Sequence, residues 1–306
     1  MTTSYHADRG AEFAPILPAL HTTKGQVHRL HFRNAEAIAR AIPDTLPTAW
    51  NRYRAAWDCK PGPSPWAGTT TMAAAKELCL AGWHDGARQA EEIARRLSLS
   101  IPQRPRLARH SIAGAVPNVP RFLAGDPLHM RALRMDDSSR RPVVTLLADA
   151  SMSAMIDASH ALLTASVQAA IVDAIEAAGF QVELFGCYRG THTGFTPGVI
   201  DVCWRIKEAG ASLDLPRLAF AAGHPAMVRR LVFALLAWDA EAYAVAGEMM
   251  CIPWNVLALD VDRPPGCYVI PGPKALPPGE ARAFGFAVDA LRKQGCPGFE
   301  TAQIAA

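Results

Sequence analysis

The sequence has no Cys-x-x-Cys pair, although it contains seven cysteines among 306 residues. The cysteines are scattered along the chain, at positions 59, 79, 187, 203, 251, 267 and 296. Such spacing fits neither a zinc knuckle nor a disulfide framework. We therefore expect free thiols and a cytoplasmic location, where thiols stay reduced.

A strong charge of one sign and a long apolar segment are also missing. The formal net charge is +3, which is too small to require a nucleic-acid partner. No apolar run behind Met1 has the form of a signal peptide, and none approaches the length of a membrane span. We therefore expect neither secretion nor a membrane partner.

The chain does contain enough apolar sequence for a substantial core. Half of the residues are hydrophobic and 19% are charged, and the length suits one large or two modest domains. We divide it into an N-terminal, mainly helical region with a linker, residues 1–140, and an α/β domain, residues 141–306. Within the first region we expect one helix over Ala35 to Ala41, a second that follows Thr69 to Thr71 and ends at Ala81, and a third over Asp85 to Leu97.

Two features of the first 140 residues each keep two interpretations. Trp50, Trp57, Trp66 and Trp83 either pack a small helical layer or form an aromatic ladder for single-stranded nucleic acid. The arginines between Arg95 and His110 belong either to a solvated linker or to a basic patch. We expect the four tryptophans to pack a helical layer and the arginines to belong to a solvated linker.

The segment from Arg141 to Gly179 organises the α/β domain. Val143 to Ala148 is a short apolar run, β-branched at its start, as expected for a strand buried on both faces. A helical pattern of apolar residues follows and ends at Gly179, where a left-handed cap is expected. Phe180 to Tyr188 then predicts a second strand, so the segment is a βαβ unit.

A polar corner joins this strand to its helix. Asp149, Ser151 and Ser153 are spaced i, i+2, i+4, so that three side-chain oxygens can converge at the carboxyl end of the strand. Ligands of open α/β sheets bind at that end. One carboxylate with two hydroxyls is an all-oxygen set that suits Mg²⁺ or Mn²⁺ rather than Zn²⁺. The alternative is that Ser151, Ser153 or Asp157 caps the helix.

The Asp-x-Ser-x-Ser corner, set between a buried strand and a helix, resembles the metal-ion-dependent adhesion site of von Willebrand factor A-type domains. The resemblance implies a cation with an open coordination position, which an Asp or Glu carboxylate of a partner fills. It also implies an antiparallel edge strand, for which Val199 to Lys207 is the candidate, followed by a loop with a threonine ligand. Here the loop from Glu208 to Leu215 has no threonine.

Three further residues are therefore candidate ligands. Ser212 and Asp214 are the oxygens available in this loop, and we expect at least one of them near Asp149. Asp239 occupies a position where the family usually places another acidic residue. The full predicted metal set is Asp149, Ser151, Ser153, Ser212, Asp214 and Asp239.

The remaining elements predict a doubly wound, mostly parallel α/β sheet. Val228 to Asp239 fits either a helix or a buried strand, and Asn255 to Asp262 fits a buried strand. Cys267 to Ile270 predicts a short strand, and Pro278 to Gln294 predicts an amphipathic helix. The whole chain also resembles an uncharacterised class of bacteriophage and prophage proteins, through the Trp-Ala-Gly at Trp66, the turn at Gly125, and the pairs His224-Pro225 and Arg229-Arg230.

These observations lead to three functional hypotheses. The first is a protein-binding module that presents a divalent cation to an acidic residue of a partner. The resemblance implies that such a module can work beside an AAA+ ATPase, as in the metal chelatases. The second is a Mg²⁺-dependent phosphoester hydrolase, which would need more carboxylates and a base such as His192 or His224. The third is RNA binding by the arginine-rich segment. The first is the expected function, without an enzymatic activity.

Overall fold

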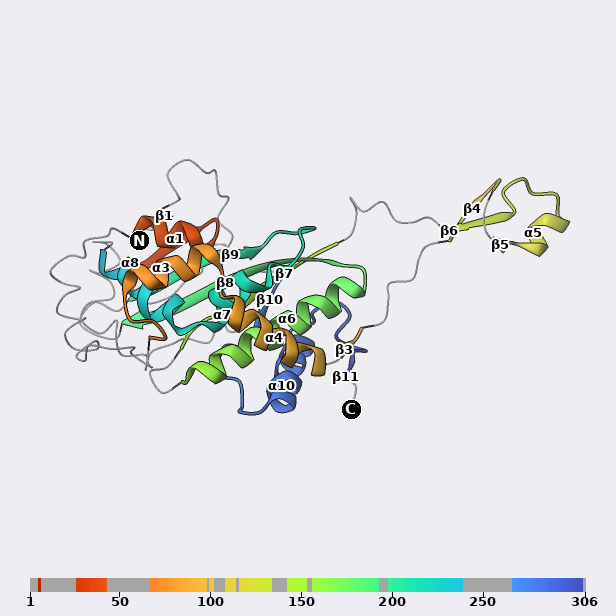
Figure 1. Cartoon of the computed structure of the whole chain (residues 1–306). Coiled ribbons are helices and arrows are strands. Elements are labelled where there is room, and N and C mark those ends of the chain that lie inside the picture. Colours follow the sequence, from red (N-terminus) through yellow and green to blue (C-terminus); the bar gives the residue numbers. More distant parts are fainter. Residues whose placement is uncertain are drawn as a thin grey trace.

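A six-stranded sheet forms the centre of the molecule (Figure 1). The computed structural model describes residues 5–6, 26–42, 67–97, 99–101, 108–113, 116–133, 142–152, 156–192, 198–238 and 266–304. The strands are β1 (Tyr5–His6), β2 (Gln26–Phe32), β7 (Val143–Asp149), β8 (Gln181–His192), β9 (Gly198–Lys207) and β10 (Cys267–Ile270). Their order in the sheet is β1-β2-β9-β8-β7-β10.

All neighbouring strands are parallel except β8 and β9. The predicted α/β class with a mostly parallel sheet is therefore confirmed. Because of the one antiparallel pair, β7, β8 and β10 run in one direction and β9, β2 and β1 run in the other. The carboxyl ends of β7, β8 and β10 therefore lie at one end of the sheet, and those of β9, β2 and β1 lie at the opposite end.

β9 is an interior strand, although Val199 to Lys207, in which polar and apolar residues alternate, was the candidate for an antiparallel edge strand. It runs antiparallel to β8 as expected, but β2 pairs with its other side from Gly198 to Trp204. Asp201, whose polarity suggested a side facing water, is buried and accepts two hydrogen bonds from Arg189, with Nε–Oδ1 and Nη2–Oδ2 distances of 2.5 and 3.0 Å. A buried ion pair therefore produces the same alternation as a solvated strand.

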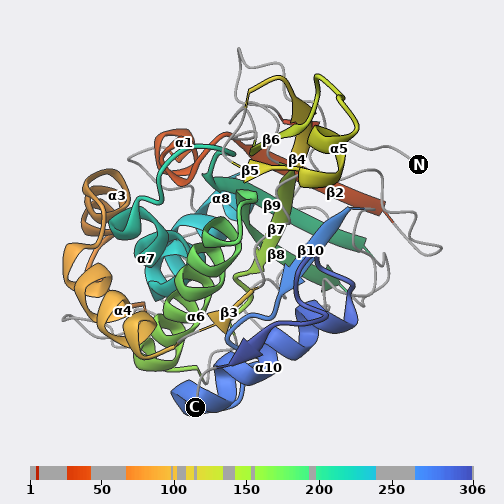
Figure 2. The same cartoon turned by 90° about the vertical axis from the view of Figure 1, so that its right-hand side faces the viewer.

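All the described helices except α5 (Val119–Leu123) gather over one face of the large sheet, to the left of the strands and below them in Figure 2. They are α1 (Ala35–Ala41), α3 (Met72–Ala81), α4 (His84–Arg96), α6 (Ala158–Ala177), α7 (Leu215–Gly223), π-helix η2 (Met227–Val232), α8 (Phe233–Trp238) and α10 (Glu280–Lys293). α6 and α10 pack against Val144 and Leu146 of β7. α1, α7 and η2 pack against Trp204 of β9.

α6 is the core helix of the domain. Its N-cap is Asp157, and the chain turns at Gly179, whose φ of 93° is a conformation that glycine adopts without strain. By length and hydropathy α6 would be able to cross a membrane, and so would the bent pair of α7 with residues 227–236. Most of α6 is buried against the sheet and against α4, α7 and α10, so the protein core accounts for its apolar composition.

The N-terminal region contributes to the same sheet and helical layer. Asn34 caps α1 and Thr71 caps α3, each by accepting a hydrogen bond from a backbone N–H three residues on. β2 pairs with β9, and α4 packs against both α6 and α7. The sheet therefore crosses the boundary placed at residue 140.

Part of the expected linker forms a small unit of its own. It consists of β4 (Ala108–Ser111), β5 (Val116–Pro117), α5 (Val119–Leu123) and β6 (Met130–Leu133), and its sheet order is β4-β6-β5. In Figure 1 it is drawn away from the large sheet. A further two-stranded sheet joins β3 (Leu99–Ser100) to β11 (Gln303–Ile304).

Several further expectations are decided by the same elements. The segment from Val228 is helical up to Trp238, so the strand alternative for it is wrong. β10 and α10 confirm the predicted C-terminal strand and helix. The strand expected over Asn255 to Asp262 lies outside the described residues, as do Trp50, Trp57 and Trp66.

The five described cysteines are buried, and none of them is in a disulfide. Cys187 and Cys203 face each other across β8 and β9 with their sulfurs 3.2 Å apart. The hydrogen bond shared with Cys203 and the burial of the pair raise the pKa of Cys187 well above its usual value. The Cys187 thiol is therefore protonated at neutral pH and is a poor nucleophile.

Candidate functional site

The candidate site lies at the carboxyl end of β7. β8 and β10 flank β7 on its two sides, with Asp149 paired to Cys187 and Ala148 paired to Ile270. The chain leaves β7 through α6 toward β8, whereas β10 lies on the other side. This arrangement is a topological switch point, the place where open α/β sheets form a ligand-binding crevice.

The carboxylate of Asp149 is fixed by the corner itself. Its Oδ1 accepts a hydrogen bond from the backbone N–H of Ser151 at 2.9 Å, which closes a tight turn at the end of the strand. Gly272, two residues beyond β10, passes close by. A Cβ atom at position 272 would lie 2.3 Å from the backbone oxygen of Asp149 and 2.9 Å from its carboxylate carbon, so only glycine fits there.

Ser151 is fully buried, and its hydroxyl oxygen has no hydrogen-bond partner among the residues that the structure describes. A buried hydroxyl without a partner costs about 1–3 kcal/mol, so this atom is expected to meet a group other than those of the described residues. The capping alternative does not explain Ser151, because Asp157 caps α6 by accepting from His160 N–H at 2.8 Å. Ser153, the third residue of the corner, lies outside the described residues.

Ser212 and Asp214 do not lie at this end of the sheet, so the expectation that they share a site with Asp149 is wrong. β9 is antiparallel to β8, and its last residue, Lys207, pairs with Leu184 near the start of β8. Gly210, in the loop that follows, approaches the side chain of Gln181, which is the register partner of Val143, the first residue of β7. The loop therefore lies at the amino end of β7.

The two residues of that loop have other environments. Ser212 is exposed. Asp214 caps α7 by accepting from Arg217 N–H at 3.1 Å, and its carboxylate pairs with the Arg217 guanidinium at 3.2 Å. Asp239, the sixth predicted ligand, follows the end of α8 and lies outside the described residues.

Two residues near the corner were not anticipated from the sequence. The buried Arg229 donates to the carbonyl of Ile156 at 2.8 Å and so holds the chain between Ser151 and α6; burial lowers the pKa of Arg229 to about 10. His160 lies 2.9 Å from the carbonyl of Pro273, which joins α6 to the chain beyond β10. An open pocket of about 340 Å³ lies beside these contacts, lined by Ile156, Asp157, His160, Pro273, Lys274, Leu276 and Pro278.

The described residues give the hydrolase hypothesis no support. Within the described ranges, no three His, Cys, Asp or Glu side chains are grouped so as to hold a metal ion. His224, one of the two candidate bases, is a core residue that stacks on Phe220 and meets the edge of Trp83. The side chain of His192, the other candidate, lies outside the described residues.

Motifs far apart in the sequence meet around His224. Gly68, just after Trp66, packs so closely on the imidazole that a Cβ atom would lie 2.8 Å from its Cε1. Arg230 donates from Nε to the hydroxyl of Thr69 at 2.7 Å. Gly68 and Thr69 thus join His224 and Arg230 within the helical layer, and no signal in the local sequence indicated that contact.

Fold and site together define an α/β protein with a mostly parallel sheet and a polar strand-to-helix corner at its switch point. A family model matches residues 20–264, and the chain belongs to that family, the domain of unknown function DUF7192. No curated protein and no solved structure matches the chain.

Proposed function

We propose that the protein is a divalent-cation-dependent binding module. The observation that carries the proposal is the buried hydroxyl of Ser151, which has no hydrogen-bond partner among the described residues and lies beside the carboxylate of Asp149, at the carboxyl end of an inner strand. The corner resembles a metal-ion-dependent adhesion site, and the helix cap that would otherwise explain Ser151 comes from Asp157.

The residues that would hold the cation are Asp149, Ser151 and Ser153. Their oxygens are hard ligands with a single formal charge, a set that suits Mg²⁺ or Mn²⁺ and leaves part of the ion's hydration in place. Such an ion keeps positions for a further oxygen ligand. We infer that an Asp or Glu side chain of a partner protein fills one of them, as the resemblance to the adhesion site implies.

The finer parts of the proposal concern the setting. Intracellular proteins with a von Willebrand factor A-type module often act together with an AAA+ ATPase, so such an ATPase is a candidate partner. The resemblance to phage and prophage proteins suggests a viral or prophage gene. The neighbouring genes test both ideas, since an adjacent ATPase gene would favour a shared assembly.

Thermal unfolding with Mg²⁺, with Mn²⁺ and with chelator tests the cation site. Binding to the native state raises the melting temperature by mass action. We expect either cation to raise the melting temperature of the wild type and to raise that of Ser151→Ala less. The melting temperature of Asp149→Ala should not change, because Asp149 carries the only formal charge of the corner.

Asp157→Ala is the matched control. This variant removes a carboxylate only eight residues from Asp149. Loss of the α6 cap should lower the free energy of unfolding by about 0.5–2 kcal/mol and so lower the melting temperature. The stabilisation by added cation should be as large as in the wild type. If the wild type and Asp149→Ala respond alike to both cations and to chelator, Asp149 is a structural residue and the proposal fails.

A further inference from the structure

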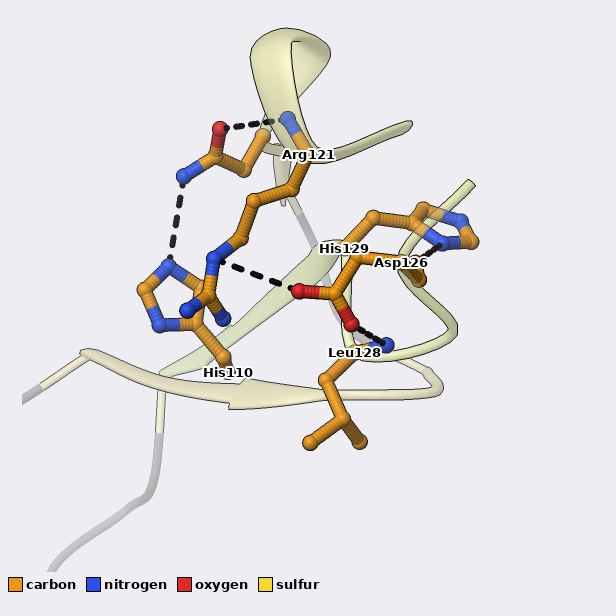
Figure 3. A network of polar contacts seen from close by, with 6 residues as sticks. His110, Arg121, Asp126, Leu128 and His129 are labelled. Carbon is orange, nitrogen blue, oxygen red and sulfur yellow. Dashed lines mark hydrogen bonds and ion pairs between the residues drawn. The ribbon is translucent and has the colours of Figure 1, made fainter. Parts of the chain in front are cut away.

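The small unit of β4, β5, β6 and α5 is held by its own polar network (Figure 3). Asn118 caps α5 by accepting from Arg121 N–H at 3.3 Å, and its amide nitrogen lies 3.2 Å from His110 Nε2. Asp126 accepts from Leu128 N–H at 2.8 Å and pairs with the Arg121 guanidinium at 3.4 Å. His129 Nδ1 lies 2.8 Å from the carbonyl of Asp126. The turn between α5 and β6 is thereby fixed.

This ordered unit exposes large apolar side chains instead of burying them. Five of the nine exposed large hydrophobic residues in the described part of the chain belong to it: Ile112, Val119, Phe122, Leu123 and Leu128. Ile112 and Leu123 are 73% and 78% exposed. A cluster of this kind on a folded unit marks a surface that meets a partner.

The charge of the chain is concentrated in the same segment. Residues 104–134 contain six arginines and one acidic residue, a net charge of +5, so the other residues of the +3 chain sum to −2. All six cations are arginines, which pair well with phosphate groups. The partner of this surface should therefore be anionic.

The exposed apolar residues form a tip at one end of the unit. β4 and β6 pair from Ala108↔Leu133 to Ser111↔Met130, so both ends of the segment leave from the Ala108 side. The exposed apolar residues all lie between Ser111 and Met130, at the far side. Of the arginines that the structure describes here, Arg109 and Arg131 are strand positions of β4 and β6, and Arg121 pairs with Asp126.

An exposed apolar tip within an arginine-rich segment matches a lipid bilayer more closely than a nucleic acid. Single-stranded nucleic acid would be met by aromatic side chains interleaved with arginines, whereas four of the five tip residues are aliphatic. At a membrane surface, apolar side chains enter the boundary between headgroups and acyl chains while basic residues meet anionic phosphates.

We propose that this unit docks the protein on an anionic lipid surface, with Ile112, Phe122 and Leu123 inserted and the arginines on the lipid phosphates. The contact is peripheral and needs no spanning segment. It revises the expectation of no membrane partner, which rested only on the lack of a span. The proposal is independent of the cation site.

Vesicle flotation with the full-length protein tests the proposal. We expect the wild type to float with vesicles of phosphatidylcholine containing about 30% phosphatidylglycerol, but not with phosphatidylcholine alone, and to be released in about 0.5 M salt. The double variant Ile112→Asp, Leu123→Asp should bind anionic vesicles at least about tenfold more weakly, because two apolar side chains no longer leave water. The wild-type melting temperature should be kept, since both side chains are exposed.

Phe286→Asp is the matched control, since Phe286 is an exposed apolar residue of α10, outside the unit. It should float like the wild type. The proposal is overturned if the wild type does not float with anionic vesicles, or if the double variant floats as well as the control. It is also overturned if a single-stranded RNA of mixed sequence, measured by fluorescence anisotropy, binds the wild type in place of vesicles and loses affinity in the double variant.

Discussion

His224 is a buried imidazole surrounded by aromatic rings and backbone. Its ring stacks on Phe220 and meets Trp83 edge-on, and its Nδ1 accepts a hydrogen bond from Ala226 N–H at 3.1 Å. Because a charged imidazole would lose its hydration there, burial lowers the pKa of His224 to about 4. The residue is therefore neutral in the fold and serves packing rather than catalysis.

This depressed pKa predicts acid sensitivity. The unfolded chain binds a proton at His224 near pH 6.5, whereas the folded chain binds it only near pH 4, so stability is full above about pH 6.5 and falls as the pH drops toward 4. The loss should approach about 3 kcal/mol. Urea unfolding at pH 7 and pH 4.5 measures it. His224→Gln should be less stable at pH 7 but should lose less between the two values; equal losses in both proteins would contradict the argument.

At the scale of elements, the junction of β8 and β9 depends on the pair of Arg189 and Asp201. Both side chains are 2% exposed, and the two hydrogen bonds between them satisfy a charge that would otherwise be isolated inside the protein. Such a pair adds little over an apolar pair of the same size, but it leaves an uncompensated charge when one member is removed.

Asp201→Ala should therefore lower the free energy of unfolding by about 3–5 kcal/mol. The double variant Arg189→Met, Asp201→Leu should recover most of that loss, because neither charge then remains buried. Guanidinium unfolding of the three proteins measures both effects. A single variant as stable as the wild type would mean that the pair is hydrated and that the strand junction does not depend on it.

Local signals in the sequence predicted most elements, and long-range pairing limited the rest. Asn34, Thr71 and Gly179 mark helix ends. Their contacts lie within a few residues along the chain, so the local sequence is enough to predict them. The pairing of β2 with β9 joins segments about 170 residues apart, and no local pattern encodes it. Within the candidate site, the corner of Asp149 and Ser151 is local. The prediction for Asp214 was wrong because its loop follows β9. The direction of β9 places that loop at the end of the sheet opposite to Asp149.

At the scale of the whole molecule, β7 is held on both sides, by β8 and β10, and covered by α6 and α10. The amides of Val144 to Leu147 should be among the slowest to exchange with deuterium, because they open only with the whole domain. The amides of β4 to β6, in a unit whose large apolar side chains are exposed, should exchange much faster. Fast exchange in Val144 to Leu147 would remove the basis for treating β7 as the core of the fold.

The small unit enters and leaves the main body at neighbouring places. Ile101, the last described residue before it, packs against Gly298 near Phe180, and the carbonyl of Pro142, just after it, accepts a hydrogen bond from Gln181 N–H at 3.0 Å. Phe180 and Gln181 are adjacent, so the two attachment points lie together at the amino end of β7. The unit is thus a detachable module: a short flexible splice between positions 101 and 142 would close a small gap at low entropic cost, and another module of the same connectivity would be tolerated there. Since Asp149 ends the same strand at its opposite end, such an exchange would leave the corner unaltered.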